Sequence, residues 1–281
     1  MQSYGWAMNQ EFIPFSPRVS CIVPCFNEDL SFLQESLASI RNQTYKDFEC
    51  IVVDESTDYK TACLCKKICD LDPRFHYIHP DQRLGLAGSL NLGILKAKGE
   101  FIARFDSDDI CSPTRFALQV KFLIENPEIG VVGSSMNLID SAGQPINHRA
   151  YALNHAAIEK NFIFFNGMAH PTVMFRKSLL QISGGAYDPA FRCAEDLEFW
   201  LRLLCRNIKF ANLPEPLVKY RQQSIIRNYE NWRYNLKARI KNFSAPYRFK
   251  KIVGILGVAL WMHLPIKPQR FLFQVIQFRK V

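Results

Sequence analysis

Three acidic side chains lie within four residues of one another, in Asp106-Ser107-Asp108-Asp109. They follow residues 101–103, whose apolar character predicts a strand. Carboxylates this close repel one another unless a cation lies between them. Mg²⁺ and Mn²⁺ prefer oxygen ligands, and proteins commonly hold Mg²⁺ through one or two carboxylates plus substrate phosphates. The cluster therefore indicates a metal–diphosphate site, with a solvated acidic loop as the alternative.

A glycine-containing stretch at residues 83–88 is a second candidate for anion binding. It has neither the Gly-Lys-Ser/Thr ending of a P-loop nor the glycine spacing of a dinucleotide fingerprint. Because it opens a predicted helix at Gly85, its backbone N–H groups favour an anion, and Arg83 adds a charge suited to phosphate. An ordinary strand–helix turn is the alternative.

Glu195 and Asp196 begin another predicted helix. Carboxylates in a first helical turn often only cap the helix. One that faces a sugar hydroxyl can instead act as a general base. Trp200, one turn further on, can pack against a sugar or lie in the core, which is the commoner case.

The elements that must position these residues alternate along the first half of the chain. Predicted strands at 19–24, 48–53, 75–79 and 100–105 are separated by predicted helices at 29–41, 58–70 and 87–97. This alternation predicts an α/β fold with a mostly parallel sheet and helices on both faces. Three of the strands run into polar or acidic residues, and ligands of such sheets bind beyond the carboxyl ends of the strands.

The second half is more mixed. We expect helices at 113–125, 154–165, 195–206 and 227–243, strands at 129–139, 171–176 and 217–221, and a turn between Pro214 and Pro216.

Composition and charge limit the function classes. The 281 residues are 48% hydrophobic and 22% charged, which is typical of a globular protein. The net charge of +9 is concentrated in residues 227–281, where 12 Lys and Arg accompany one acid. A nucleic-acid-binding protein would need basic residues across its folded face, so the acidic remainder argues against that class.

The compartment expected from the sequence is the cytoplasm. The nine cysteines fit no common zinc pattern and are expected to be reduced thiols. Residues 1–17 lack the basic and apolar regions of a secretory signal. No apolar run reaches the roughly 18 residues needed to span a bilayer.

Five segments in sequence order carry a family resemblance: VSCIVPCFNE (19–28), IVVDESTD (51–58), GEFIARFDSDD (99–109), HPTVMFR (170–176) and AEDLEFWLRL (194–203). Together they resemble the family 2 inverting glycosyltransferases with the GT-A fold, over about residues 18–223. The variant most similar to this chain is the bacterial O-antigen, lipopolysaccharide and capsule group. Glu55, where Asp is common, and Gln222, where His is common, depart from the pattern.

The resemblance implies a role for each matching residue. It assigns the nucleotide-sugar site to Pro24, Phe26, Glu28, Asp54, Arg83, Gly85, Asp106, Ser107 and Asp108. Asp108 is the implied ligand of Mn²⁺ or Mg²⁺. Asp196 is the implied catalytic base, with Glu195 beside it. The implied acceptor-binding residues are His170, Trp200 and Asp109. As alternatives, His170 can be structural and Asp109 can support the loop or touch the donor.

The reaction implied by the resemblance moves a sugar from a UDP-sugar to a lipid-diphosphate-linked saccharide and forms a β-linkage. A non-catalytic nucleotide-sugar-binding partner and a metal-dependent nucleotidyltransferase are the alternatives. A glycoside hydrolase would need paired carboxylic acids flanking a glycosidic bond, which a diphosphate site argues against.

The predicted organisation is a catalytic domain at 1–223 and a basic segment at 224–281. Within the domain, about 18–110 form the nucleotide-sugar half and about 111–223 the acceptor half. The segment combines Arg248, Lys250 and Lys251 with apolar residues such as Leu256 and Leu260. This composition is typical of a segment lying on anionic lipid, and predicts a peripheral protein on the inner face of the cytoplasmic membrane. A helical pair packed on the body is the alternative.

Overall fold

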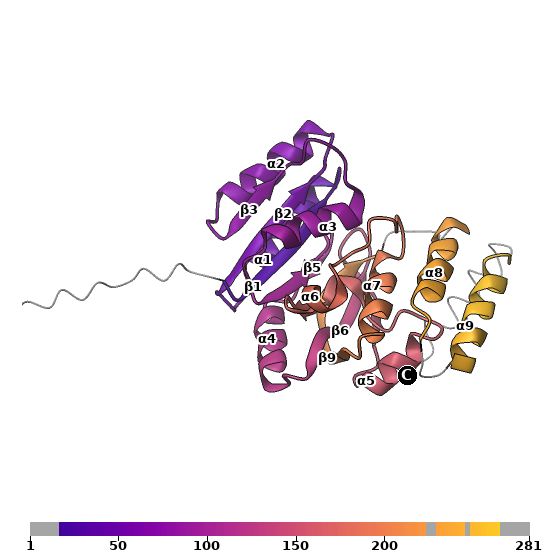
Figure 1. The fold of residues 1–281 in the computed structure, drawn as a ribbon. Helices are drawn as coiled ribbons and strands as arrows, with labels where there is room; N and C mark the ends of the chain where they lie inside the picture. Colours follow the sequence, from indigo (N-terminus) through magenta and orange to yellow (C-terminus); the bar gives the residue numbers. More distant parts are fainter. Residues whose placement is uncertain (1–16, 223–228, 245–247, 265–281) are drawn as a thin grey trace, which may run out of the picture.

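The computed structural model describes residues 17–222, 229–244 and 248–264 (Figure 1). Within these residues, nine strands form a sheet in the order β3-β2-β1-β4-β8-β6-β9-β5, and β7 pairs with β6. The strands are β1 (Val19–Cys25), β2 (Phe48–Asp54), β3 (Phe75–Ile78), β4 (Phe101–Arg104), β5 (Ile110–Cys111), β6 (Ile129–Ile139), β7 (Pro145–Arg149), β8 (Met174–Arg176) and β9 (Lys209–Arg221). The α/β fold predicted from the sequence is confirmed.

Helices cover both faces of the sheet. They are α1 (Leu30–Arg41), α2 (Tyr59–Asp70), α3 (Gly85–Lys96), α4 (Arg115–Glu125), α5 (His155–Asn161), α6 (Leu179–Ser183), α7 (Glu195–Leu204), α8 (Tyr229–Lys241) and α9 (Arg248–Trp261), with a 3-10 turn, η1 (His170–Thr172). Helices α1, α2 and α4 share one apolar core, whereas α3, α5, α6 and α7 share the other. Because successive strand residues point to opposite faces, Cys21 enters the first core and Ile22 the second.

The parallel half of the sheet places the carboxyl ends of its strands together. Strands β3, β2, β1 and β4 are parallel neighbours, and the register pairs Cys25 with Asp54 at the ends of β1 and β2. The mostly parallel arrangement is limited to this half. Beyond β4 the sheet is mixed, because β8 runs antiparallel to both β4 and β6, while β6 and β9 are parallel.

Two predicted elements differ from the observed ones at prolines. The strand expected at 171–176 divides into η1 and the short β8, because Pro171 occupies the first turn of the 3-10 helix. The turn expected between Pro214 and Pro216 lies inside β9. There the register with β6 shifts, since Ser134 pairs with Leu213 and Ser135 with Pro216, and such irregularities tolerate proline within a strand.

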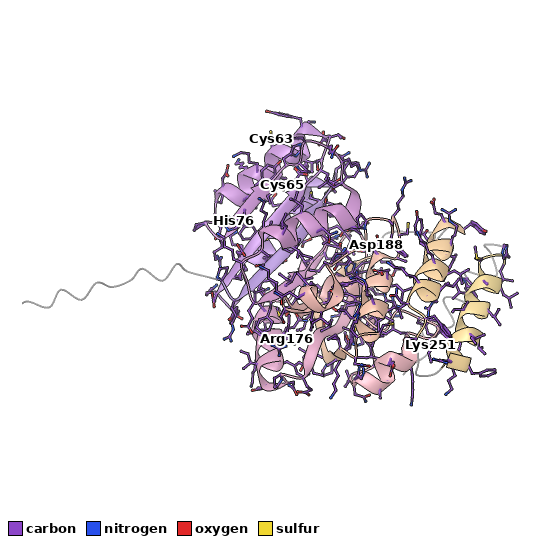
Figure 2. All side chains as sticks on the ribbon, in the orientation of Figure 1. Cys63, Cys65, His76, Arg176, Asp188 and Lys251 are labelled. Atoms are coloured by element: carbon purple, nitrogen blue, oxygen red, sulfur yellow. The ribbon has the colours of Figure 1, made fainter. Side chains whose placement is uncertain are left out.

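The C-terminal helices lie on one side of the body, where α8 packs against α7 and α9 against α8 (Figure 1). Lys241 forms ion pairs with Asp188, labelled in Figure 2, and with Glu198 of α7. This packing corresponds to the helical pair that the sequence left as an alternative. None of the helices in the described ranges is both long and apolar enough to cross a membrane. Part of the predicted 224–281 segment, including the proposed boundary at 223/224, lies outside the described residues.

Candidate active site

The acidic loop after β4 gathers three carboxylates around one point. One ligand oxygen from each of Asp106, Asp108 and Asp109 lies within 4.8 Å of the other two. Burial, together with the charges of Asp106 and Glu28, raises the pKa of Asp108 to about 7. Asp109 is fully buried, and its Oδ2 finds no hydrogen-bond donor among the described residues. An all-oxygen, densely negative donor set of this kind suits a hard divalent cation.

Arg221, at the end of β9, donates hydrogen bonds to this loop. Its backbone N–H donates to Asp109 Oδ1 at 2.8 Å, and its Nε donates to the Asp108 carbonyl at 2.9 Å. Its guanidinium also reaches Glu35 Oε2 at 2.6 Å and lies 4.0 Å from the ring centre of Phe32. The last strand of the body thus fixes the geometry of the acidic loop.

Buried Arg104, at the end of β4, contacts Asp106, the first residue of the loop. Its Nη1 donates to Asp106 Oδ2, while Ser36 Oγ donates to the Asp106 carbonyl at 3.0 Å. Asp106 is therefore restrained at both its side chain and its backbone.

The loops after β1 and β2 form the adjoining part of the sheet edge. Ser107 Oγ donates to Glu28 Oε2 at 3.2 Å, which joins the β1 loop to the acidic loop. Asp54 is fully buried and accepts hydrogen bonds from Tyr77 Oη at 2.9 Å and from the Ser56 N–H at 3.0 Å. The half-buried Pro24 precedes this edge on β1.

Arg83 and Phe26 form an exposed stack beside the same edge. The guanidinium carbon of Arg83 lies 3.7 Å from the centre of the Phe26 ring. The Arg83 side chain is 64% exposed, so that it can reorient toward a ligand. The two residues come from loops after different strands, Phe26 from the loop after β1 and Arg83 from the loop after β3.

The amides at the start of α3 already bind an anion, which is the chain's own Glu55. The N–H groups of Leu84 and Gly85 each donate to Glu55 Oε2 at 3.1 Å, and Ser89 Oγ donates to Oε1. The glycine-containing turn predicted as a phosphate cradle is thus closed by an internal carboxylate. Glu55, noted in the sequence only as a departure, is the residue that organises this turn.

The carboxylates of Glu195 and Asp196 lie in the first turn of α7. Asn166 Nδ2 donates to Asp196 Oδ2 at 2.6 Å, and the Leu197 N–H donates to Oδ1 at 2.7 Å. Burial, with the charge of Asp196, raises the pKa of the neighbouring Glu195 to about 8. The acidic loop and the start of α7 are connected through η1. Arg104 contacts Asp106 and donates its backbone N–H to the Val173 carbonyl at 3.1 Å, and His170 of η1 lies 3.8 Å from Glu195.

His170 and Trp200 lie beneath these carboxylates. Nε2 of His170 is 2.9 Å from Tyr187 Oη, and its Nδ1 is 3.8 Å from Glu195 Oε1. Burial, with Arg104 nearby, holds the pKa of His170 well below its usual value, so the ring is neutral at pH 7. Trp200 is fully buried against His170 and neighbouring phenylalanines, so it is a core residue and does not offer the acceptor-binding surface that the resemblance implies. Asp109 is likewise buried, and its contacts are those of loop support.

Comparison with known families decides the identity of this arrangement. The model of the family described as glycosyl transferase family 2 matches residues 20–181, which is more than half of the chain. The chain belongs to glycosyltransferase family 2.

Relatives of this glycosyltransferase act in bacterial polysaccharide synthesis according to their names. The O-antigen biosynthesis glycosyltransferase WbnJ of Escherichia coli is 37% identical over 235 residues, covering 78% of this chain and 91% of the relative. The amylovoran biosynthesis glycosyltransferase AmsE of Erwinia amylovora is 26% identical over 264 residues, covering 91% and 97%.

Solved structures show that this glycosyltransferase has a GT-A-like fold. S. aureus TarS 1–349 in complex with UDP-GlcNAc matches with a TM-score of 0.66 at 19% identity, covering 93% of this chain and 76% of that one. The mannosyltransferase PcManGT from Pyrobaculum calidifontis, in complex with GDP-Man and Mn²⁺, matches with a TM-score of 0.64 at 21% identity, covering 90% and 71%.

Proposed function

We propose that this glycosyltransferase moves a sugar from a nucleotide-sugar to a lipid-linked saccharide of a bacterial surface polysaccharide, with inversion of the anomeric configuration. A UDP-sugar is the proposed donor. The observation that carries the proposal is the proximity of two groups of carboxylates. The acidic loop 106–109 suits a metal–diphosphate, and Asp196 is in the first turn of α7, which Arg104 and His170 connect to that loop. The names of the relatives and the ligands of the solved neighbours support the donor and acceptor classes.

The donor would bind at the shared edge of β1, β2 and β4. The position proposed for the nucleoside is beside Asp54 and the Arg83–Phe26 stack, and Glu28 contacts the acidic loop through Ser107. Asp108, with Asp106 beside it, would hold Mn²⁺ or Mg²⁺, as their carboxylate oxygens fit a hard cation. The cation, when bound, neutralises charge on the diphosphate leaving group.

The transfer itself requires one base. The acceptor hydroxyl oxygen forms a bond to the anomeric carbon while the bond from that carbon to the diphosphate breaks, and the nucleoside diphosphate leaves with the electron pair. Asp196 takes the hydroxyl proton. Asn166 and the Leu197 amide orient its carboxylate. Glu195 is protonated near pH 7 and so adds no second charge beside the base. A single displacement converts an α-linked donor to a β-linked product.

Asp196→Asn tests the base, with Asp70→Asn as the control. Asp70 is an exposed acid on α2 that pairs with Lys66. We expect the Asp196 variant to lose transfer by about 10²-fold or more while its Mn²⁺-dependent UDP affinity stays unchanged. The control should match the wild type in both assays. Transfer at the wild-type rate by the Asp196 variant would refute the base, and release of pyrophosphate in place of UDP would indicate a nucleotidyltransferase.

We further propose that α9 attaches the enzyme to an anionic membrane surface. Apolar side chains recur along its exposed side, at Phe249, Ile252, Val253, Leu256 and Leu260. The helix begins with Arg248, Lys250 and Lys251. An exposed apolar stripe beside basic residues is the composition of a helix that lies in the membrane interface.

A further inference from the structure

A cavity of about 410 Å³ lies beside Asp196, and the C-terminal helices form one of its walls. Residues 164–166 and the start of α7 line one side. Trp232 and Asn235 of α8 and Gly257 and Trp261 of α9 line another. The volume is within the range of pockets that hold small molecules. The carboxylate proposed as the base therefore lines a cavity whose wall includes the C-terminal helices α8 and α9.

The contacts of α8 and α9 show that this wall is built into the protein. Buried Arg239 of α8 donates to the carbonyls of Phe162 and Ile163, and its Nε donates to Asn235 Oδ1 at 2.8 Å. A Cβ added at Gly254 of α9 would lie 2.2 Å from the Ile163 carbonyl oxygen, so α9 approaches the same loop through a glycine. Both helices are thus fixed on the segment that leads directly to Asn166.

The lining of the cavity combines aromatic rings with groups that bind hydroxyls. Phe164 and Phe165 supply rings on one side, and Trp232 and Trp261 supply rings on the other, with their centroids 5.9 Å apart. Asn166, Asn235, Asp196 and Arg149 supply amide, carboxylate and guanidinium groups. Aromatic faces match the apolar C–H faces of a sugar ring, while these polar groups both donate to and accept from its hydroxyls. Asp196 and Asn235 already accept hydrogen bonds within the protein, but each of their carboxylate or amide oxygens has a second lone pair with which it can accept from a sugar hydroxyl.

We infer that this cavity binds the saccharide of the acceptor, and that α8 and α9 determine which saccharide is accepted. The inference rests on the proposed function, because it uses Asp196 as the base. It extends that proposal in one respect. Both helices lie beyond residues 20–181, the part of the chain that the family model matches, so acceptor selectivity is assigned to elements outside the matched domain.

Gly257→Leu tests the inference by filling the cavity. Nothing lies within 4 Å of the position of a Cβ at Gly257, so a larger side chain enters space that lines the cavity without displacing the core. Gly257→Ala is the size-matched comparison, because it changes the same backbone position but adds only one methyl group to the cavity. Phe164→Ala is a second variant, which removes a half-exposed ring from the opposite side.

The assay measures UDP release by the full chain with farnesyl-diphosphate-linked monosaccharides as acceptor probes, and UDP binding in Mn²⁺ by calorimetry. We expect Gly257→Leu and Phe164→Ala to raise the acceptor KM about tenfold while UDP affinity is unchanged. Gly257→Ala should raise the acceptor KM less than Gly257→Leu does, because it fills less of the cavity. An unchanged acceptor KM in Gly257→Leu would overturn the inference and leave the proposed function intact.

Two further outcomes separate the inference from the proposed function. Farnesyl phosphate, which carries no sugar, tests the lipid chain as the occupant. If it inhibits as strongly as the sugar-linked probe, and if Gly257→Leu weakens both to the same extent, the cavity holds the lipid chain. That result would overturn the saccharide assignment. Wild-type UDP release that no sugar-linked acceptor stimulates would overturn the proposed function itself, and the inference with it.

Discussion

Replacing Asp108 with Asn should stabilise the metal-free protein above neutral pH, although it should abolish transfer. Burial and the charges of Asp106 and Glu28 raise the pKa of Asp108 from an ordinary 3.8 to about 7. An acid whose pKa is raised on folding binds more protons in the folded state than in the unfolded state. The free energy of unfolding of the wild type must therefore fall as pH rises from about 4 to about 7, and the Asn variant lacks this contribution.

The pKa shift sets the size of the effect. Each pKa unit corresponds to about 1.4 kcal/mol, so the difference between 3.8 and about 7 gives an upper bound of roughly 4 kcal/mol at pH 8. Asn keeps a buried polar group, and the neighbouring carboxylates still repel one another, so we expect about half of that bound. For a chain of this length, about 2 kcal/mol corresponds to a rise in Tm of roughly 4 °C.

Thermal unfolding in EDTA at pH 5 and pH 8 measures the effect. The difference in Tm between Asp108→Asn and the wild type should be larger at pH 8 than at pH 5. Asp58→Asn is the control, because hydrogen bonds from Thr61 lower the pKa of this exposed helix cap, and it should give no gain at pH 8. A variant that is less stable than the wild type at pH 8 would show that Asp108 is not strained in the metal-free loop.

Four further predictions concern separate parts of the molecule. Mn²⁺ binding near pH 7 should release protons from Asp108, measured as a dependence of calorimetric enthalpy on the buffer. Arg221→Met should cost about 3 kcal/mol of stability and weaken Mn²⁺-dependent UDP binding, measured by denaturation and calorimetry, because it removes the donor to the carbonyls of Asp108, Asp140 and Ser141. Arg83→Ala should weaken UDP binding several-fold without changing Tm, because the side chain is exposed. The double variant Leu256→Ser and Leu260→Ser should bind anionic vesicles less in a sedimentation assay while UDP affinity is unchanged.

The first half of the fold could be predicted from the sequence because its signals are local. Asp29 and Asp58 are predicted at helix starts, and Asp29 accepts hydrogen bonds from the Ser31 and Phe32 amides and Asp58 from the Thr61 amide. The strand ends of β1, β2 and β4 share one edge because parallel pairing requires it, which is why the acidic loop lies next to Glu28.

What the sequence did not indicate depends on contacts between distant residues. Arg221 binds the carbonyl of Asp108 across 113 positions, and no local pattern marks that pairing. The Glu55 carboxylate accepts a hydrogen bond from the Gly85 amide because α3 begins beside the end of β2, and only the packed structure shows this proximity. The cavity beside Asp196 forms because α8 and α9 pack against the loop at residues 162–166. The sequence of these two helices indicates only a basic segment with apolar residues, and it does not indicate that packing.

Several basic residues of the C-terminal segment form contacts within the fold and do not face a membrane as free charges. Arg239 is buried and donates to loop carbonyls, Lys241 pairs with Asp188 and Glu198, and Lys251 donates to the Ser244 carbonyl at 2.9 Å. These cations hold α8 and α9 to the body and to each other. Because a cation engaged inside the fold contributes less to attraction toward lipid, the total charge of this segment overstates its affinity for a membrane. The interface therefore depends more on the exposed apolar stripe of α9, which is why removing leucines from that stripe should reduce vesicle binding more than removing Lys241.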